Sequence, residues 1–294
     1  MRVHGCGAHA RVAAAYRTPQ GREDGVYADL RSEDLSTRLI DHTLAETGLT
    51  GDHVDDLLWG VAQQRGEQDN NVARVIALLS ELGESTPAAT INRWCASSMQ
   101  AVISAADAVA AGNRDCILAG GVEHMSRVPT DGDAYRHLHP ELSDRYDVSR
   151  LRMGATAETV AEEYDVSRAA QDEYAARSHR RAASATESGR FDDEIVPVET
   201  PDGIVETDEG IRPDATVEAR LKLPPAFASD GTVTAGNASQ ISDGGAIALG
   251  HPLGASGARL PVTLVHEMNE RDVDRGLATL CVGFGQGAAV ELRR

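Results

Sequence analysis

Hydrophobic positions up to residue 121 follow two spacings, one typical of buried strands and one typical of amphipathic helices. Short apolar runs predict strands at residues 9–16, 54–61, 87–92 and 115–121. Apolar residues three or four apart predict helices at 33–47, at 70–82 with Gly83 as the cap, and at 96–111 ending at Gly112. Because strands and helices alternate, the pattern favours an α/β chain with a largely parallel sheet.

The pattern changes between residue 122 and about residue 230. A polar stretch at 130–147 precedes two helical patterns at 156–164 and 167–188, and 191–206 alternates like a hairpin. We interpret this region as an inserted, solvent-facing subdomain. Beyond it, Gly-Ala-Ser-Gly at 254–257 opens a helix that leads to a strand, as Cys-Ala-Ser-Ser at 95–98 does, which indicates a weak internal duplication.

Composition and charge limit the classes of partner. The chain has 294 residues and a net charge of −18, so length suggests two domains, and neither nucleic acid nor an anionic membrane is an expected partner. No apolar run approaches the ~18 residues of a membrane span, and the N-terminus lacks the apolar core of a signal peptide. Four widely spaced cysteines without a CxxC pair predict reduced thiols, and we expect a cytoplasmic protein.

Three short stretches flanked by small residues and glycines carry the candidate chemistry. Cys95 lies between an expected strand and an expected helix, where the helix dipole favours a thiolate of lowered pKa. His251 lies in a Gly-His-Pro turn and is a candidate base, and Cys281 ends a strand before a glycine-rich loop whose N–H groups suit an oxyanion. The alternatives are two inert core cysteines and a histidine that only caps a turn.

Metal and nucleotide sites are not predicted. The pair His137-x-His139 lacks a suitably spaced third ligand, and the chain has neither a GxGxxG fingerprint after a strand nor a GxxxxGK[ST] loop.

The motifs NRWCASSMQAV, GHPLGASGAR and CVGFGQG resemble those of the thiolase family. So do Arg17-Thr18-Pro19, GGVEHMSRVP at 120–129, the segment 153–179 and DGTVTAGNAS at 230–239, so the resemblance covers nearly the whole chain. It implies a layered α/β/α/β/α fold with an N-terminal half at 1–243, a loop subdomain inserted at about 122–230, and a truncated C-terminal half at 244–294.

The resemblance also implies roles for individual residues. Cys95 would be the nucleophile that becomes acylated, His251 the base that activates it and helps to hold the thioester oxyanion, and Cys281 the acid and base at the acetyl carbon. The N–H groups of Cys95 and Gly283 would form the second oxyanion hole.

The implied reaction is thiolysis of a 3-ketoacyl-CoA, or the reverse Claisen condensation, through a covalent thioester. Met153 and Ser239 would line the pantetheine arm of coenzyme A, which is a co-substrate and not a bound cofactor. The expected assembly is a homo-oligomer, either dimer or tetramer, or a hetero-oligomer with a full-length thiolase. Decarboxylating condensing enzymes also resemble this fold, but they generally have His where Cys281 lies.

This chain departs from the family between Asp243 and Gly244. Thiolases have about a hundred more residues there, most of a domain by length, including an Asn-Glu-Ala-Phe motif whose Asn positions a water in the first oxyanion hole. No residue of this chain is assigned to that role. The alternatives to a working thiolase are therefore a catalytically impaired acyl-CoA-binding or partner subunit and a fragmentary gene product.

Overall fold

A three-stranded parallel sheet forms the centre of the N-terminal half. The computed structural model describes residues 9–128, 138–214, 216–243 and 249–294. Strand β2 (Asp56–Gly60) lies between β3 (Ala88–Ile91) and β4 (Ile117–Gly121), and both neighbours run parallel to it. This arrangement confirms the expected parallel sheet, and each strand lies within its predicted range.

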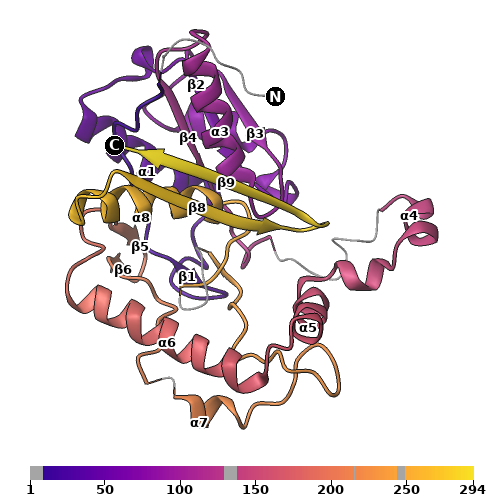
Figure 1. Cartoon of the computed structure of the whole chain (residues 1–294). Coiled ribbons are helices and arrows are strands. Elements are labelled where there is room, and N and C mark those ends of the chain that lie inside the picture. The colour runs from indigo at the N-terminus through magenta and orange to yellow at the C-terminus, as the bar shows by residue number, and fades with distance from the viewer. Residues whose placement is uncertain (1–8, 129–137, 215, 244–248) are drawn as a thin grey trace.

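Helices cover both faces of this sheet (Figure 1). The helices concerned are α1 (Ser32–Thr47), α2 (Val72–Leu79) and α3 (Ser97–Ala110). Alternating residues Leu57 and Trp59 of β2 face α1 and α2 in the main hydrophobic core. On the opposite face a Cβ added to Gly60 would lie 2.1 Å from the Ser98 nitrogen, so glycine allows the start of α3 to approach the sheet closely.

The C-terminal half contains one helix and one hairpin among the described residues. They are α8 (Ser256–Glu270), β8 (Arg275–Val282) and β9 (Gln286–Arg293). Helix α8 packs against α3, and the antiparallel hairpin packs on both helices through Ala278, Val282 and Val290. The order of layers is α1 and α2, sheet, α3 with α8, then hairpin, which fits the expected α/β fold.

The outer face of the β8–β9 hairpin is exposed. Leu277 points outward with 64% of its surface accessible, and within the described ranges β8 and β9 pair only with one another. The outermost helical layer of the expected fold is thus not seen in the part of the chain that the structure describes. This agrees with a shortened C-terminal half.

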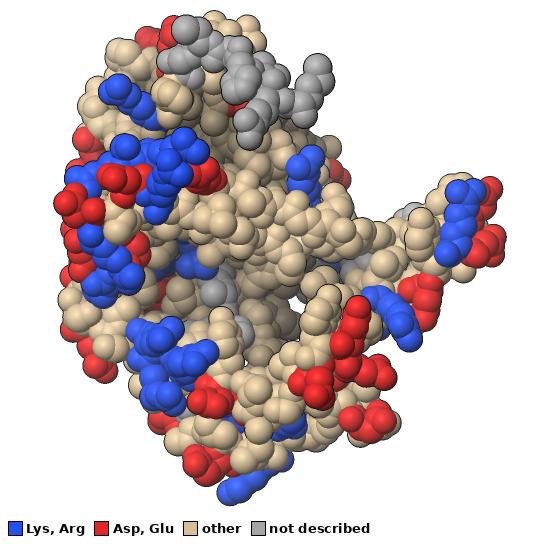
Figure 2. Space-filling model, in the orientation of Figure 1, with Lys and Arg blue, Asp and Glu red and all other residues tan. Residues whose placement is uncertain are grey.

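The inserted region and the segments next to it carry several small elements. They are α4 (Pro140–Arg145), α5 (Met153–Glu163), α6 (Arg168–Glu187), β5 (Val198–Thr200), β6 (Gly203–Val205), α7 (Val217–Arg220), and the pair β1 (Gly21–Arg22) with β7 (Ser242–Asp243). Helix α4 projects from the body of the molecule (Figure 1). Its surroundings carry acidic and basic side chains next to one another, whereas the middle of this face is largely uncharged (Figure 2).

Buried ion pairs tie this region to the N-terminal segment. The Arg17 guanidinium lies 2.6 Å from a Glu194 carboxylate oxygen and 2.7 Å from Asp208, and all three side chains are almost fully buried. A buried arginine with two carboxylate partners is compensated in charge and in hydrogen bonds, so this cluster fixes where the inserted region meets the core.

Three expectations need correction or fall outside the described residues. Residues 9–16 form no strand, since they have no strand neighbour within the described sheets to accept and donate hydrogen bonds. Helix α2 is capped at Ser80, three residues before Gly83, which adopts a left-handed φ of 69° in the following turn. His137 and the junction at 244–246 lie outside the described residues.

Candidate active site

Cys95 lies in the tight turn between β3 and α3. Its side chain is 4% exposed, and α3 begins two residues later. The Trp94 carbonyl accepts a hydrogen bond from the Ser97 hydroxyl at 2.5 Å, and the Asn92 side chain accepts one from the Trp94 N–H at 2.9 Å. These contacts fix the turn, as expected for a thiol held between a strand and a helix.

The expected low pKa of this thiol is wrong for the protein without substrate. Burial raises the pKa of Cys95 to about 11, and the N–H groups of Gly283 and of Cys95 itself lower it only in part. Desolvation of a thiolate at 4% exposure therefore outweighs these two N–H groups. A nucleophilic Cys95 needs a neighbouring base to remove its proton.

Cys281 and Gly283 lie at the end of β8, next to Cys95. The charge of a Cys281 thiolate raises the pKa of Cys95, and the Gly283 N–H acts on the same sulfur in the opposite direction. Cys281 is exposed, whereas Cys95 is buried. The structure therefore brings together three of the predicted groups, although 186 residues of sequence, the difference between positions 95 and 281, separate the two thiols.

His251 follows Gly250 in the loop before α8. Its Nδ1 atom lies 2.6 Å from the Ser256 hydroxyl, and that hydroxyl donates to the Pro252 carbonyl at 3.1 Å. A hydroxyl has one proton, so if it is donated to Pro252, Nδ1–H donates to Ser256 and the Nε2 lone pair is available. Burial, together with the positive charge of Arg259, lowers the pKa of His251 to about 4, so the ring is neutral at pH 7.

The ring of His251 makes no hydrogen bond to the Cys95 sulfur among the described residues. The loops that carry the two residues nevertheless interlock. The Ser98 N–H donates to the Gly254 carbonyl at 3.1 Å, and the Ser98 hydroxyl donates to the Ala255 carbonyl at 3.0 Å. The starts of α3 and α8 are thus held against each other by direct hydrogen bonds.

Glu123 is a site residue to which the sequence analysis gave no role. Its buried carboxylate accepts hydrogen bonds from the N–H groups of Ala62, Gln63 and Gly254 and from the Gln68 side chain. It thereby connects the loop after β2 to the loop of His251. The signal in the sequence was an acidic residue directly after a buried strand, in Gly-Gly-Val-Glu-His.

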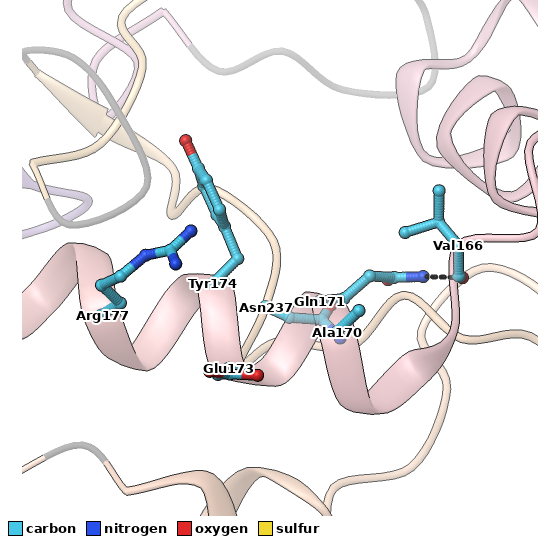
Figure 3. Close-up of a pocket in the computed structure, with 7 residues that line it drawn as sticks. All are labelled: Val166, Ala170, Gln171, Glu173, Tyr174, Arg177 and Asn237. Carbon is cyan, nitrogen blue, oxygen red and sulfur yellow. Dashed lines mark hydrogen bonds between the residues drawn. The ribbon is translucent and has the colours of Figure 1, made fainter.

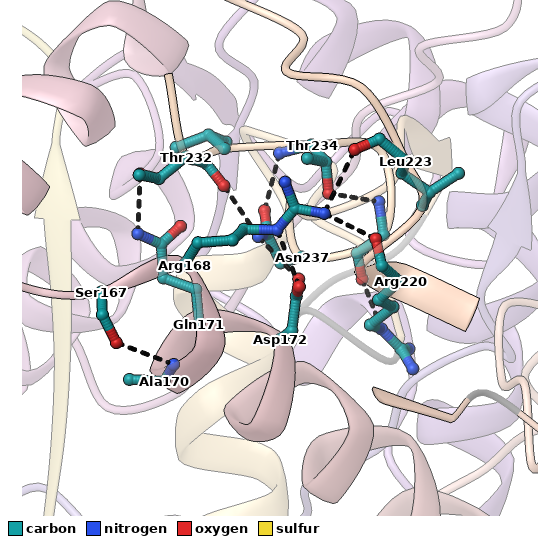
Figure 4. A network of polar contacts seen from close by, with 12 residues as sticks. Ser167, Arg168, Ala170, Gln171, Asp172, Arg220, Leu223, Thr232, Thr234 and Asn237 are labelled. Atoms are coloured by element: carbon teal, nitrogen blue, oxygen red, sulfur yellow. Dashed lines mark hydrogen bonds and ion pairs between the residues drawn. The ribbon is translucent and has the colours of Figure 1, made fainter. Parts of the chain in front are cut away.

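Of the two residues expected to line coenzyme A, Met153 lies in the inserted region and Ser239 follows it. Met153 begins α5 and is 42% exposed, and Ser239 is exposed shortly before β7. No hydrogen bond joins them within the described ranges. The segment that ends at Ser239 is fixed to α6 by the network in Figure 4, in which the Asn237 amide donates to Asp172 at 2.9 Å. Arg168 continues that network to Asp172 at 2.7 Å and to the Arg220 carbonyl at 2.5 Å.

A pocket of about 520 Å³ lies along the exposed face of α6 (Figure 3). It is lined by Val166, Ala170, Gln171, Glu173, Tyr174, Arg177 and Asn237. None of the candidate catalytic residues lines it, so we do not assign it to the reaction. Within the described residues, no cluster of acidic, His or Cys side chains suits a metal ion, and no helix has the length and apolar character needed to cross a membrane.

Comparison with known proteins agrees with these motifs. The family model described as the thiolase N-terminal domain matches residues 10–250, and the thiolase C-terminal domain matches residues 226–294. The two matches share residues 226–250, on both sides of the junction at Asp243.

Curated relatives give the same result. The chain is 36% identical to 3-ketoacyl-CoA thiolases of Erwinia tasmaniensis, Pectobacterium carotovorum and Escherichia coli, over 96% of this chain and 98% of each relative. The aligned stretch is 383 residues long, whereas this chain has 294, so many positions of the relatives have no counterpart here. Matches of this extent show that the chain belongs to the thiolase family.

Proposed function

We propose that this protein is an acyl-CoA C-acyltransferase that cleaves a 3-ketoacyl-CoA with coenzyme A, or catalyses the reverse condensation, through a thioester on Cys95. The observation that carries the proposal is that the turn of Cys95 meets the end of β8, which carries Cys281 and Gly283. Trp94, next to Cys95, packs beside Gly283 and against the ring of Phe284. The printed name of the relatives, 3-ketoacyl-CoA thiolase, supports the same substrate class.

In the first half-reaction, His251 Nε2 takes the Cys95 proton, and the thiolate attacks the 3-keto carbon. The bond between the 2- and 3-carbons breaks, and its electron pair goes to the 2-carbon, which Cys281 protonates. Acetyl-CoA leaves, and the shortened acyl group remains on Cys95. The N–H groups of Cys95 and Gly283 favour negative charge at this point, which suits the thioester oxyanion.

In the second half-reaction, the Cys281 thiolate takes the proton of free coenzyme A. The coenzyme A thiolate then attacks the thioester carbonyl, and the Cys95 thiolate leaves and takes its proton back from His251. A neutral His251 is needed at the start of the cycle, and the lowered pKa of His251 keeps the ring neutral at pH 7. The same shift weakens the ring as a base, so the proton transfer from Cys95 requires substrate binding to change these surroundings. The missing hydrogen bond to Cys95 is compatible with it, since catalytic hydrogen bonds often shorten only when substrate binds.

A second candidate is a binding or partner subunit without turnover. The outer face of the β8–β9 hairpin favours it, because Leu277 is 64% exposed and neither strand has a further neighbour among the described residues. Such a chain would keep the coenzyme A contacts of Met153 and Ser239 and pair with a full-length thiolase. In either case we propose a cytoplasmic oligomer with coenzyme A as a co-substrate or ligand and no resident cofactor.

The test is a thiolysis assay of the purified full chain with acetoacetyl-CoA and with a longer 3-ketoacyl-CoA. We expect turnover that a Cys95→Ser variant lacks, together with an acyl adduct on Cys95 by mass spectrometry. A folded protein that gives neither turnover nor adduct would exclude the enzyme. Retained acyl-CoA binding in that sample would support the partner subunit.

A further inference from the structure

Two aromatic residues flank the groups on which the proposed function depends. Trp94 directly precedes Cys95, and Phe284 directly follows Gly283. Their ring centroids lie 5.6 Å apart with planes tilted by 32°, and both side chains are partly buried.

Both residues have backbone conformations that are uncommon for bulky side chains. The φ angle is 47° at Trp94 and 64° at Phe284, in the left-handed region. Such conformations persist where the surroundings fix them, and they cluster at functional sites. Hydrogen bonds with Asn92 and Ser97 fix Trp94, whereas Phe284 lies in the short turn between β8 and β9.

The ring pair joins two segments that otherwise belong to different halves of the molecule. Trp94 lies in the loop before α3, and its Cγ atom lies 3.9 Å from the position that a Cβ of Gly283 would occupy. Trp94 thus packs beside Gly283, and its ring also contacts the ring of Phe284. Because β8 and β9 have no further strand neighbour among the described residues, this contact is a direct restraint on the turn.

We propose that Trp94 and Phe284 are positioning residues, whose ring contact keeps the turn that carries the Gly283 N–H next to Cys95. The inference rests on the proposed function in that it takes Cys95 as the nucleophile. It extends that function by naming what holds the oxyanion donor of the hairpin in register with the nucleophile of α3.

The variant Phe284→Gly separates positioning from folding. Glycine adopts a φ of 64° without steric cost, which offsets part of the packing lost with the ring, so we expect a melting temperature close to that of the wild type. Loss of the ring frees the turn, and the Gly283 N–H then stabilises the thiolate less. The pH midpoint of Cys95 alkylation by iodoacetamide, followed by peptide mass spectrometry, should therefore move to higher pH, with alkylation slowed several-fold below that midpoint.

In thiolysis, Phe284→Gly should lower kcat about tenfold and leave the KM for coenzyme A unchanged, because a weakened oxyanion donor acts mainly on the transition state. Phe284→Tyr keeps the ring and should restore both readouts. A wild-type alkylation profile in Phe284→Gly would overturn the proposal, as would a lowered melting temperature that accounts for the activity loss. Alkylation needs no turnover, so a shifted midpoint in an inactive chain would contradict the proposed function and still support the ring contact.

Discussion

The Glu123 carboxylate accepts a hydrogen bond from the Gly254 N–H at 2.7 Å, although 131 residues separate the two in sequence. The same carboxylate accepts from Ala62 and Gln63 after β2, so one buried side chain connects the parallel sheet to the loop of His251. Burial raises the pKa of Glu123, whereas its four hydrogen-bond donors lower it.

Replacement of Glu123 by Gln should disturb this connection. The amide nitrogen of Gln cannot accept, so at least one buried N–H loses its partner, at a cost of about 1–3 kcal/mol in the free energy of unfolding. We expect a lower urea midpoint and a loss of thiolysis larger than the loss of folded protein, since the His251 loop is displaced. Arg145→Gln, in an exposed ion pair of α4, is the control and should change neither. Equal stability of Glu123→Gln and the wild type would contradict the role of Glu123.

Ser256→Ala tests how the His251 tautomer is fixed. Without the hydroxyl, Nδ1 loses its hydrogen-bond partner, and the proton distributes between the two ring nitrogens. We expect kcat to fall about tenfold or more, less than the ~10²–10⁴ typical of losing a general base outright, as in His251→Ala. Ser104→Ala, which removes a hydroxyl on α3 bonded to Gln100, is the matched control. Wild-type kcat in Ser256→Ala would show that the hydroxyl does not select the tautomer.

Gly257→Ala tests the close contact between α3 and α8. The new Cβ would lie 2.5 Å from the Met99 backbone nitrogen, so the two helices must separate. We expect destabilisation of about 1–3 kcal/mol by overpacking, measured by urea denaturation, and slower alkylation of Cys95. At Gly287 an added Cβ would meet its nearest atom at 3.8 Å, so Gly287→Ala should stay within about 0.5 kcal/mol of the wild type. Similar stabilities for the two variants would refute the close packing.

Acidification should destabilise the protein through two histidines. Burial lowers the pKa of both His179 and His251 to about 4, below the value of about 6.5 in an unfolded chain. The unfolded chain therefore binds more protons as the pH falls through 6.5, and the stability present above that pH is lost progressively towards pH 4.

His179→Gln isolates one of these contributions. In the wild type, His179 Nδ1 accepts a hydrogen bond from the Arg212 N–H at 3.1 Å. The side-chain oxygen of Gln can accept the same hydrogen bond. Between pH 7 and 5 the free energy of unfolding of this variant should fall less steeply than that of the wild type, by up to about 1.4 kcal/mol per pH unit. Parallel curves for the two proteins would show that His179 titrates normally.

Local sequence patterns were sufficient to predict most secondary structure. Hydrophobic spacing located β2, β3, β4, α1 and α3 within a few residues, because the apolar side chains of each element pack against a hydrophobic core. Residues 9–16 have the same kind of pattern and form no strand, because a strand needs a neighbour that periodicity cannot reveal.

For the candidate site too, the sequence predicted some features and the fold decided others. Motifs in the sequence singled out Cys95, His251 and Cys281, but they wrongly predicted a low pKa for Cys95, since the degree of burial follows from tertiary packing. Three features of the site were visible only in the folded structure. They are the hydrogen bond that links Glu123 to Gly254, the hydrogen bond between His251 and Ser256, and the contact of Trp94 with Phe284.

Sequence by itself determined which reactive side chains this protein has, which strands and helices carry them, and to which family it belongs. Tertiary structure decided which groups meet, because the loops before α3 and α8 and the turn of the β8–β9 hairpin are distant in the chain and come together only when α3 and α8 pack. It also decided the protonation states of Cys95 and His251, because desolvation depends on atoms that packing places around them.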